Sequence, residues 1–144
     1  SGHFDVRANA FHRAPHTTSD MLFRGALTSG RALVRGLVNI HQRAPHSNGY
    51  QKGDILLLGP NSEAAVIPDL EIDNNNVRCT HGATVSRPDV EKLFYLQSRG
   101  LSPADALATF VSGFFQSALG RFPVPAATEK ITAFLSRQQE DSYV

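Results

Sequence analysis

The stretch Val34-Arg35-Gly36-Leu37-Val38-Asn39-Ile40-His41 carries small or apolar residues at every second position, with mostly polar residues between them. A period of two residues is typical of a half-buried β-strand. The same alternation occurs over residues 4–10. Further extended stretches are predicted at residues 21–27, 54–58, 64–72 and 77–85, with turn-forming breakers at 43–49, 59–61 and 73–76.

Five or six predicted strands therefore follow one another with no helix between them. This order is compatible with a sandwich, a barrel or a β-helix, of which the first two are more common. No sequence repeat of fixed length indicates a solenoid. Residue patterns alone predict a mainly β region and leave its architecture open.

The pattern becomes helical at about residue 87. Ser86 is the predicted N-cap of a helix over residues 88–99, because a proline occupies its first turn and a glycine follows its end. We therefore predict a β portion over residues 1–86 and a C-terminal helical domain over residues 87–144.

A second predicted helix, residues 103–119, opens at Ser102 with the capping-box shape Ser-Pro-Ala-Asp. Most of its apolar residues are predicted to be core residues: Leu107, Phe110, Val111, Phe114, Phe115 and Leu119. A third helix, predicted over residues 126–139, carries Ile131, Phe134 and Leu135 on one face.

Composition narrows the class of protein. A formal charge of +1 and 41% hydrophobic residues in 144 predict a globular protein rather than a nucleic-acid binder or a disordered chain. One cysteine cannot form an internal disulfide and no signal-peptide pattern is found, so a cytoplasm-like compartment is expected. No apolar run is long enough to cross a membrane. Ser1-Gly2 resembles an expression remnant, and the natural chain is expected to begin further upstream.

The run Cys79-Thr80-His81-Gly82-Ala83-Thr84 holds the only cysteine two residues before a histidine. In an extended segment alternate side chains share a face, so Cys79 and His81 are predicted to point the same way. Thiolate and imidazole suit iron in sulfur clusters or zinc, yet two ligands cannot close a site that needs four. A partner or a second copy would have to supply the rest. The alternative for Cys79 is a core position, because free cysteine is often buried.

The remaining histidines and hydroxyl groups of the sequence show no motif of a metal site or of a catalytic site. His12, His16, His41 and His46 show no recurrent ligand spacing, and exposed positions are the predicted explanation for them. A metal-dependent enzyme of the cupin type ranks last, because the sequence lacks a His-x-His pair. No Gly-x-Ser-x-Gly elbow and no phosphate-cradling glycine loop with a lysine is found, so we expect no catalysis by this chain alone.

Several separated motifs occur in order along roughly residues 20–120. They are Phe23-Arg24-Gly25, residues 54–59, 67–72, 78–85 and 92–101, and Ala104-Asp105-Ala106. Together they resemble the C-terminal part of the SufB/SufD family, whose members are sometimes labelled ABC transporter permeases. The Cys-Thr-His-Gly-Ala-Thr spelling is similar to the SufD branch, since the SufB branch typically has Glu-His-Glu-Ala-Thr there. Family members are considerably longer, so the chain resembles a short or excised C-terminal portion.

The resemblance implies a truncated right-handed parallel β-helix followed by a small helical domain. It implies a scaffold that assembles iron-sulfur clusters with a SufB-like subunit and the SufC-like ABC ATPase. In the family the last β-helix turns pair across the SufB–SufD interface, where His81 corresponds to a candidate cluster ligand. Any cluster would be bound transiently. The alternative is a purely structural assembly subunit in which His81 and Cys79 only pack or form hydrogen bonds.

Two further expectations concern contacts. The C-terminal helices of the family engage SufC, so the second helix and the loop around Arg99-Gly100 are the expected contact region. A truncated β-helix exposes strand edges, which predicts a homodimer through the terminal rungs in the absence of the partner.

Overall fold

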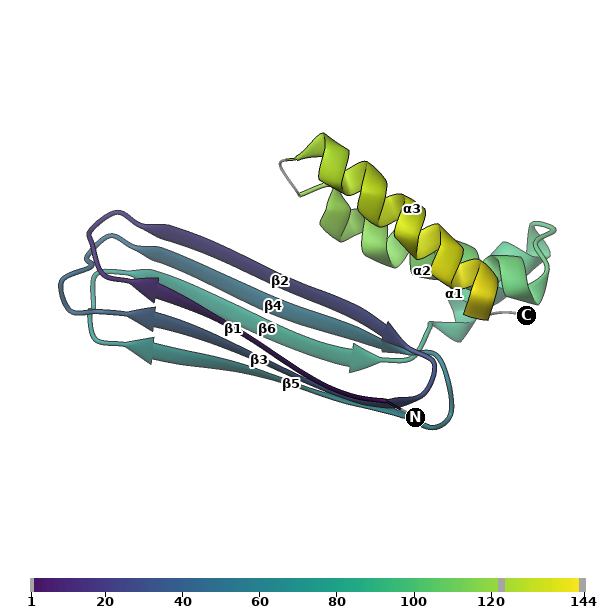
Figure 1. Ribbon diagram of the computed structural model, residues 1–144, viewed down its shortest axis with the longest axis horizontal. Coiled ribbons are helices and arrows are strands. Elements are labelled where there is room, and N and C mark those ends of the chain that lie inside the picture. Colours follow the sequence, from purple (N-terminus) through teal and green to yellow (C-terminus); the bar gives the residue numbers. More distant parts are fainter. Residues whose placement is uncertain (1, 122–123, 143–144) are drawn as a thin grey trace. The chain divides into compact units, whose positions relative to one another are not determined.

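The computed structural model describes residues 2–121 and 124–142 (Figure 1). Two compact units divide the chain, Ser1–Ser86 and Arg87–Val144. The first unit contains the strands β1 (His3–His12), β2 (Thr18–Leu27), β3 (Gly30–Ile40), β4 (Asn48–Leu57), β5 (Ser62–Ile72) and β6 (Arg78–Ser86). The second contains the helices α1 (Val90–Ser98), α2 (Pro103–Leu119) and α3 (Pro125–Ser142).

Successive strands alternate between two parallel sheets (Figure 1). One sheet has the order β1-β3-β5 and the other the order β2-β4-β6, and every pairing is parallel. We call β1/β2, β3/β4 and β5/β6 the first, second and third rungs. This is a β-helix-like coil followed by helices, as the family resemblance implies. A sandwich or a barrel, the more common architectures for such a strand order, is wrong. Those folds pair consecutive strands, whereas here each strand pairs with the next but one.

The rungs repeat at nearly constant spacing. Strand β4 pairs with β2 and with β6 at an offset of 30 residues, as in Thr18↔Asn48 and Asn48↔Arg78. In the other sheet the offset is 28 residues between β1 and β3 and 32 between β3 and β5. The turns carry the same repeat, since Arg-Ala-Pro-His-Thr at 13–17 recurs as Arg-Ala-Pro-His-Ser at 43–47. A repeat of about thirty residues is therefore present, contrary to the sequence-based expectation.

The core lies between the two sheets and is centred on the second rung. Its fully or nearly buried apolar residues form two clusters, Leu27, Ala32, Val34 and Ile55 in one, and Val38, Ile40 and Ala44 in the other. Glycines allow the sheets to approach: a Cβ added at Gly49 would lie 2.7 Å from Val38 Cγ1. Burial falls off in β5 and β6, which are edge strands of their sheets.

Strand β4 is longer than its hydrophobic pattern predicts. The sequence predicts a strand only over 54–58, whereas the strand begins at Asn48. The missing half contains Gln51, which is buried and whose Nε2 donates to the Asp69 carbonyl oxygen at 2.7 Å. A polar side chain at an inward position hides the alternation on which the prediction depends.

The helical unit begins later than predicted. Asp89, not Ser86, caps α1, and its side chain accepts hydrogen bonds from the backbone N–H groups of Glu91 and Lys92. Carboxylate caps are as effective as hydroxyl caps and also favour the positive end of the helix dipole. The expected helix stop is confirmed, since Gly100 has φ 98° and the left-handed conformation favours glycine.

Helix α2 packs against both α1 and α3. Its predicted start is confirmed, because the Ser102 hydroxyl accepts a hydrogen bond from the Asp105 backbone N–H at 3.1 Å. Ala106, Val111 and Leu119 are its buried residues. The Leu135 side chain, predicted to lie on the apolar face of α3, is outside the described part of the structure. Among the described residues, none of the helices is both long and apolar enough to span a membrane.

Candidate functional site

Strand β6 carries both residues of the candidate ligand pair and forms an edge of its sheet. It pairs with β4 on one side, and Gln51↔His81 and Gly49↔Cys79 are direct partners in that pairing. Alternation along β6 puts Cys79 and His81 on one face of the strand. This face is directed toward the opposite sheet, where His81 contacts Pro68 and Cys79 packs near Val38. An edge strand presents backbone donors and acceptors that no neighbouring strand uses.

His81 is exposed and is oriented by the opposite sheet. Its Nδ1 lies 3.2 Å from the carbonyl oxygen of Pro68, a half-buried residue of edge strand β5. A carbonyl oxygen can only accept, so in the neutral ring Nδ1 carries the hydrogen and donates. The lone pair is then on Nε2. A backbone carbonyl that holds one ring nitrogen is the usual support of a metal-binding histidine.

Cys79 lies in a different environment from its neighbour. It is partly buried and packs with the core cluster around Val38 and Ile40. Burial raises the pKa of the Cys79 thiol, and a hydrogen bond with the backbone of Thr80 lowers it by a smaller amount. A raised pKa keeps the thiol protonated at neutral pH, and the thiolate is the form that binds metals. The Cys79 environment therefore favours packing over ligation in the isolated chain.

The ligand set is incomplete within the described residues. Among the side chains that the structure describes, three His, Cys, Asp or Glu residues nowhere gather closely enough to hold a metal ion. What the geometry offers is one imidazole nitrogen, on an edge strand, with its second nitrogen already hydrogen-bonded. Such a group can supply one ligand to a metal whose other ligands come from elsewhere.

Gln51 lies beside His81 in the same register and was not singled out by the sequence. Its Oε1 is buried without a hydrogen-bond partner among the described residues, and Gly36 faces it, where an added Cβ would collide with that oxygen. The signal that could have found it is a polar residue at an inward position, flanked by Gly49 and Gly53. Gln51 connects the two sheets directly beside the His81 ring.

His12 is buried, which corrects the prediction that it is exposed. Only 3% of its surface is accessible. Its Nδ1 lies 2.7 Å from Thr17 Oγ1 and its Nε2 lies 2.8 Å from Ser19 Oγ. Thr17 Oγ1 is also 2.9 Å from Ser47 Oγ in the next rung. His12 is thus a hydrogen-bonded core residue, because hydroxyl groups satisfy both of its ring nitrogens.

The other three histidines of that group are exposed, as predicted. His16 and His46 occupy equivalent turn positions with φ 58° and 60°, and their rings stack with centroids 4.9 Å apart. His41 is in the second turn, where its Nδ1 accepts the Arg43 backbone N–H at 3.1 Å. They lie on turns rather than beside His81.

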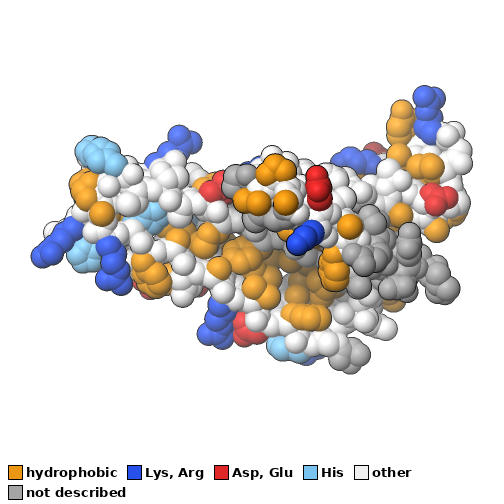
Figure 2. All heavy atoms as spheres, turned by 45° about the horizontal axis from the view of Figure 1, so that its top comes forward, with side chains coloured by type: hydrophobic (Ala, Val, Ile, Leu, Met, Phe, Trp, Pro, Cys, Tyr) orange, Lys and Arg blue, Asp and Glu red, His pale blue; other side chains and the backbone are white. Residues whose placement is uncertain are grey.

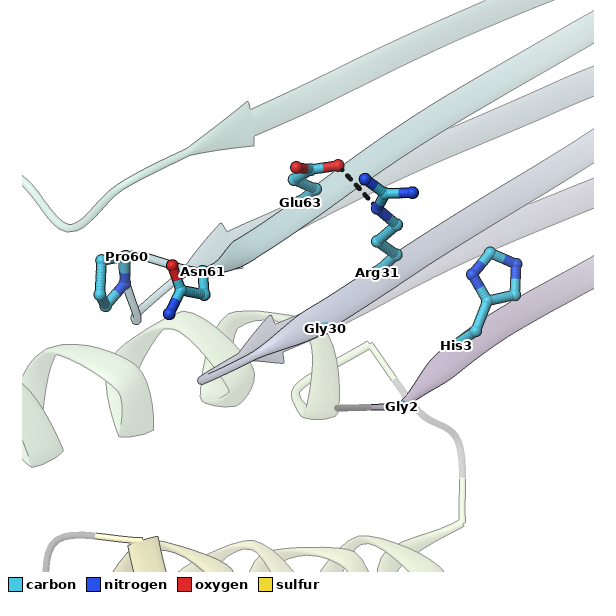
Figure 3. Close-up of a pocket in the computed structure, with 7 residues that line it drawn as sticks. All are labelled: Gly2, His3, Gly30, Arg31, Pro60, Asn61 and Glu63. Carbon is cyan, nitrogen blue, oxygen red and sulfur yellow. Dashed lines mark ion pairs between the residues drawn. The ribbon is translucent and has the colours of Figure 1, made fainter.

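A hollow at the starts of β1, β3 and β5 offers little chemistry (Figure 3). Its lining residues are Gly2, His3, Gly30, Arg31, Pro60, Asn61 and Glu63. Arg31 Nε and Glu63 Oε2 form an ion pair of 2.9 Å across the second and third rungs, and both side chains are exposed. The charges of this hollow therefore compensate each other.

Comparison with known proteins decides the family. The profile described as "SUF system FeS cluster assembly, SufBD core domain" matches residues 1–114. The chain belongs to the SufBD core family. It is therefore related to proteins of iron-sulfur cluster assembly, and the parallel two-sheet coil with the Cys-Thr-His run is part of this SufBD core match.

Curated relatives agree with this assignment. The iron-sulfur cluster assembly protein SufD of Escherichia coli is 42% identical over 111 residues, which are 76% of this chain and 26% of that protein. A SufBD family protein of Mycobacterium bovis is 36% identical over 128 residues, 88% of this chain and 15% of that protein. A SufBD family protein of Staphylococcus haemolyticus is 32% identical over 126 residues, 87% and 27% respectively. The SufBD chain described here thus spans about a quarter or less of the length of these relatives.

Proposed function

We propose that this chain is the C-terminal part of a SufD-like scaffold subunit, which assembles iron-sulfur clusters together with a SufB-like subunit and a SufC-like ATPase. Its family membership and its similarity to SufD support this assignment. The alternation of strands between two parallel sheets supports a right-handed parallel β-helix, because crossover connections between parallel strands are nearly always right-handed. The proposed boundary between the scaffold portion and the helical domain lies between residues 86 and 87, where the chain divides into two compact units.

The observation that carries the proposal is the orientation of His81. The Pro68 carbonyl holds Nδ1, which leaves Nε2 as one ligand for a cluster whose other ligands come from the partner. The cluster is cargo, bound transiently. Imidazole is a weaker ligand for cluster iron than thiolate, which suits a scaffold that releases its product. Cys79 is the second candidate ligand and would have to lose its thiol proton first.

The third rung is the proposed surface for the SufB-like subunit. Strands β5 and β6 are sheet edges, and three of their large apolar side chains are exposed: Ile67, Ile72 and Val85. Open edges and apolar side chains together favour strand-to-strand association. Without the partner, the same surface is proposed to form a two-fold homodimer. Light scattering coupled to size-exclusion chromatography tests this, and a clean monomer at micromolar concentration contradicts it.

The helical unit is the proposed surface for the SufC-like ATPase. Val90 and Phe94 lie one turn apart on α1 and are 75% and 73% exposed, whereas the apolar residues of α2 are mostly buried or half-buried. The exposed apolar side chains of α1 favour α1 over α2 as the proposed contact region, together with the Arg99-Gly100 loop that the sequence analysis names. ATP hydrolysis would belong to the partner, and this chain alone would catalyse no reaction. A cytoplasm-like compartment fits an oxygen-sensitive cargo and a chain with one free cysteine.

Anaerobic reconstitution with iron and sulfide in the presence of the SufB-like partner tests the ligand role. His81→Ala is expected to lower the bound iron and acid-labile sulfide, while the matched control His16→Ala, another exposed histidine, keeps the wild-type yield. Cys79→Ser separates the two candidate ligands, and an unchanged yield is expected because its thiol packs in the core. Equal yields for His81→Ala and wild type would support the purely structural assembly subunit instead.

A further inference from the structure

We propose that the turns after β1 and β3 form a binding site for a phosphate group, with Arg13, His41 and Arg43 as its donors. These three residues line one hollow on the surface of the β unit. All three are exposed. The site is separate from His81 and does not depend on the proposed cluster role.

A difference in turn length brings the three side chains together. Before the turn, His12 pairs with Ile40 at an offset of 28 residues, and after it Thr18 pairs with Asn48 at an offset of 30. The second turn is therefore two residues longer than the first. The backbone ladder continues into it, since the His41 N–H donates to the His12 carbonyl oxygen at 3.0 Å.

The extra length gives Arg13 two basic neighbours in the second turn. His41 follows the residue paired with His12, so it lies next to Arg13 in the rung direction. Arg43 is the repeat equivalent of Arg13, as the two Arg-Ala-Pro-His segments show. Adjacent strands of a sheet are about 4.8 Å apart, which is within the span of one phosphate group and its donors.

Two of the three donor side chains, those of His41 and Arg13, already make contacts within the chain. His41 Nδ1 accepts the backbone N–H of Arg43 at 3.1 Å, so the neutral ring carries its hydrogen on Nε2 and can donate it to a ligand. The Arg13 guanidinium lies over the Phe11 ring, 5.6 Å from its centroid. One guanidinium group can donate two parallel, charge-assisted hydrogen bonds to two oxygens of a phosphate group.

Charge compensation separates this hollow from the one at the other end of the strands. There, Arg31 is paired with Glu63. At the end of the β unit that carries the turns after β1 and β3, neither Arg13 nor Arg43 has an ion pair within the described residues. Basic and histidine side chains gather at this end, on the left of the view (Figure 2). Asp73 is the neighbour of His41 in the third rung, because Ile40 pairs with Ile72 and the Asp73 N–H donates to the Ile40 carbonyl oxygen.

Two guanidinium groups that form no ion pair among the described residues lie in adjacent turns and repel each other, and a bound dianion would relieve that repulsion. A phosphate group fits better than a single carboxylate because it offers oxygens to both guanidinium groups and to the imidazole at once. The ligand class is a small phosphate compound, either inorganic or carrying the group on an organic body.

Titration with sodium pyrophosphate at constant ionic strength tests the site, with calorimetry for affinity and NMR of the His41 ring for location. We expect saturable binding that shifts the His41 resonances. Arg13→Gln and Arg43→Gln should each weaken binding about tenfold, the usual worth of one charge-assisted hydrogen bond. Arg31→Gln is the matched control and should leave affinity unchanged. Asp73→Asn removes the carboxylate beside His41, which repels an anion, and should therefore strengthen binding.

Two further ligands and one further variant test which chemical group is recognised. ADP and adenosine distinguish recognition of the phosphate from recognition of an organic body: ADP should bind like pyrophosphate and adenosine should not bind. Arg43→Lys keeps the charge but loses the planar fork, so an intermediate affinity with an unchanged melting temperature is expected. Absence of saturable binding overturns the proposal, as does a response that chloride reproduces or that Arg43→Gln leaves unchanged.

Discussion

The second and third rungs have the same alternating pattern but differ in what surrounds them. Ile40 in β3 and Ile72 in β5 are direct partners in the sheet, yet Ile40 is fully buried and Ile72 is 42% exposed. The second rung has neighbours on both sides, whereas the third is paired on one side only. An identical residue thus contributes to the core in one rung and to the exposed surface in the next. Burial is concentrated in the second rung, and the proposed partner surface lies on the third.

The largest effect is expected from truncating these two isoleucines. Ile40→Ala should lower the free energy of unfolding by about 2–5 kcal/mol, because it leaves a cavity in the core. Ile72→Ala removes the same atoms from a partly exposed position and should cost much less. Urea denaturation of both variants measures the difference. Equal losses would show that the third rung is as well packed as the second.

A smaller effect is expected where the sheets approach most closely. A Cβ at Gly49 would lie 2.7 Å from Val38 Cγ1 and 3.0 Å from Cys79 Sγ, so Gly49→Ala should cost about 1–3 kcal/mol through overpacking. Gly82→Ala is the matched control, since its nearest neighbour would be Lys52 Cγ at 3.7 Å. It should change stability by less than about 1 kcal/mol, or raise it slightly, by restricting the unfolded chain. Thermal melts of the two variants that coincide would contradict this.

The ion pair that joins the two rungs should contribute little. Arg31 and Glu63 are both largely exposed, so Glu63→Gln is expected to lower the free energy of unfolding by less than about 1 kcal/mol. Screening by salt should abolish the difference between variant and wild type. Chemical denaturation at low and high salt measures it, and a loss that persists in high salt would argue for a role other than charge pairing.

The smallest effect concerns Cys79, which belongs to the third rung but packs on the second. Its raised pKa means that the folded protein retains the thiol proton more strongly than the unfolded chain. The resulting stabilisation is present below the ordinary thiol pKa of about 8.5 and is lost as the pH rises through the folded value. Alkylation by iodoacetamide should accordingly be slower in the folded protein than in urea at pH 8. Stability of Cys79→Ala should show a weaker decline at alkaline pH.

The alternation of apolar and polar residues was sufficient to locate strands whose inward positions are apolar. Residues 34–41 fall almost wholly in β3, while the first half of β4 was missed because Gln51 is polar and buried. The coil itself was predicted from the family resemblance, although the Arg-Ala-Pro-His segments at 13–17 and 43–47 carry its spacing. The repeat is hard to recognise elsewhere, because inward positions require only small or apolar residues and not the same ones.

The common face of Cys79 and His81 was predictable from alternation, because it depends only on local backbone geometry. Their different environments were not predictable in this way. The Pro68 carbonyl that holds His81 belongs to the other sheet, and the apolar cluster that receives Cys79 comes from β3. Likewise, the burial of His12 depends on hydroxyl groups contributed by later residues. Contacts between rungs and sheets are set by register, which residue patterns do not specify.

Pro68 has a consequence for how the coil can be extended. Proline has no amide hydrogen, and on edge strand β5 it interrupts the row of donors that an added strand would need. Strand β6, the other edge of the same rung, contains no proline between Arg78 and Ser86. Fibre-like growth by continuous pairing along both edges is therefore disfavoured. A chain that docks here can pair without interruption only along the strand that presents the His81 imidazole.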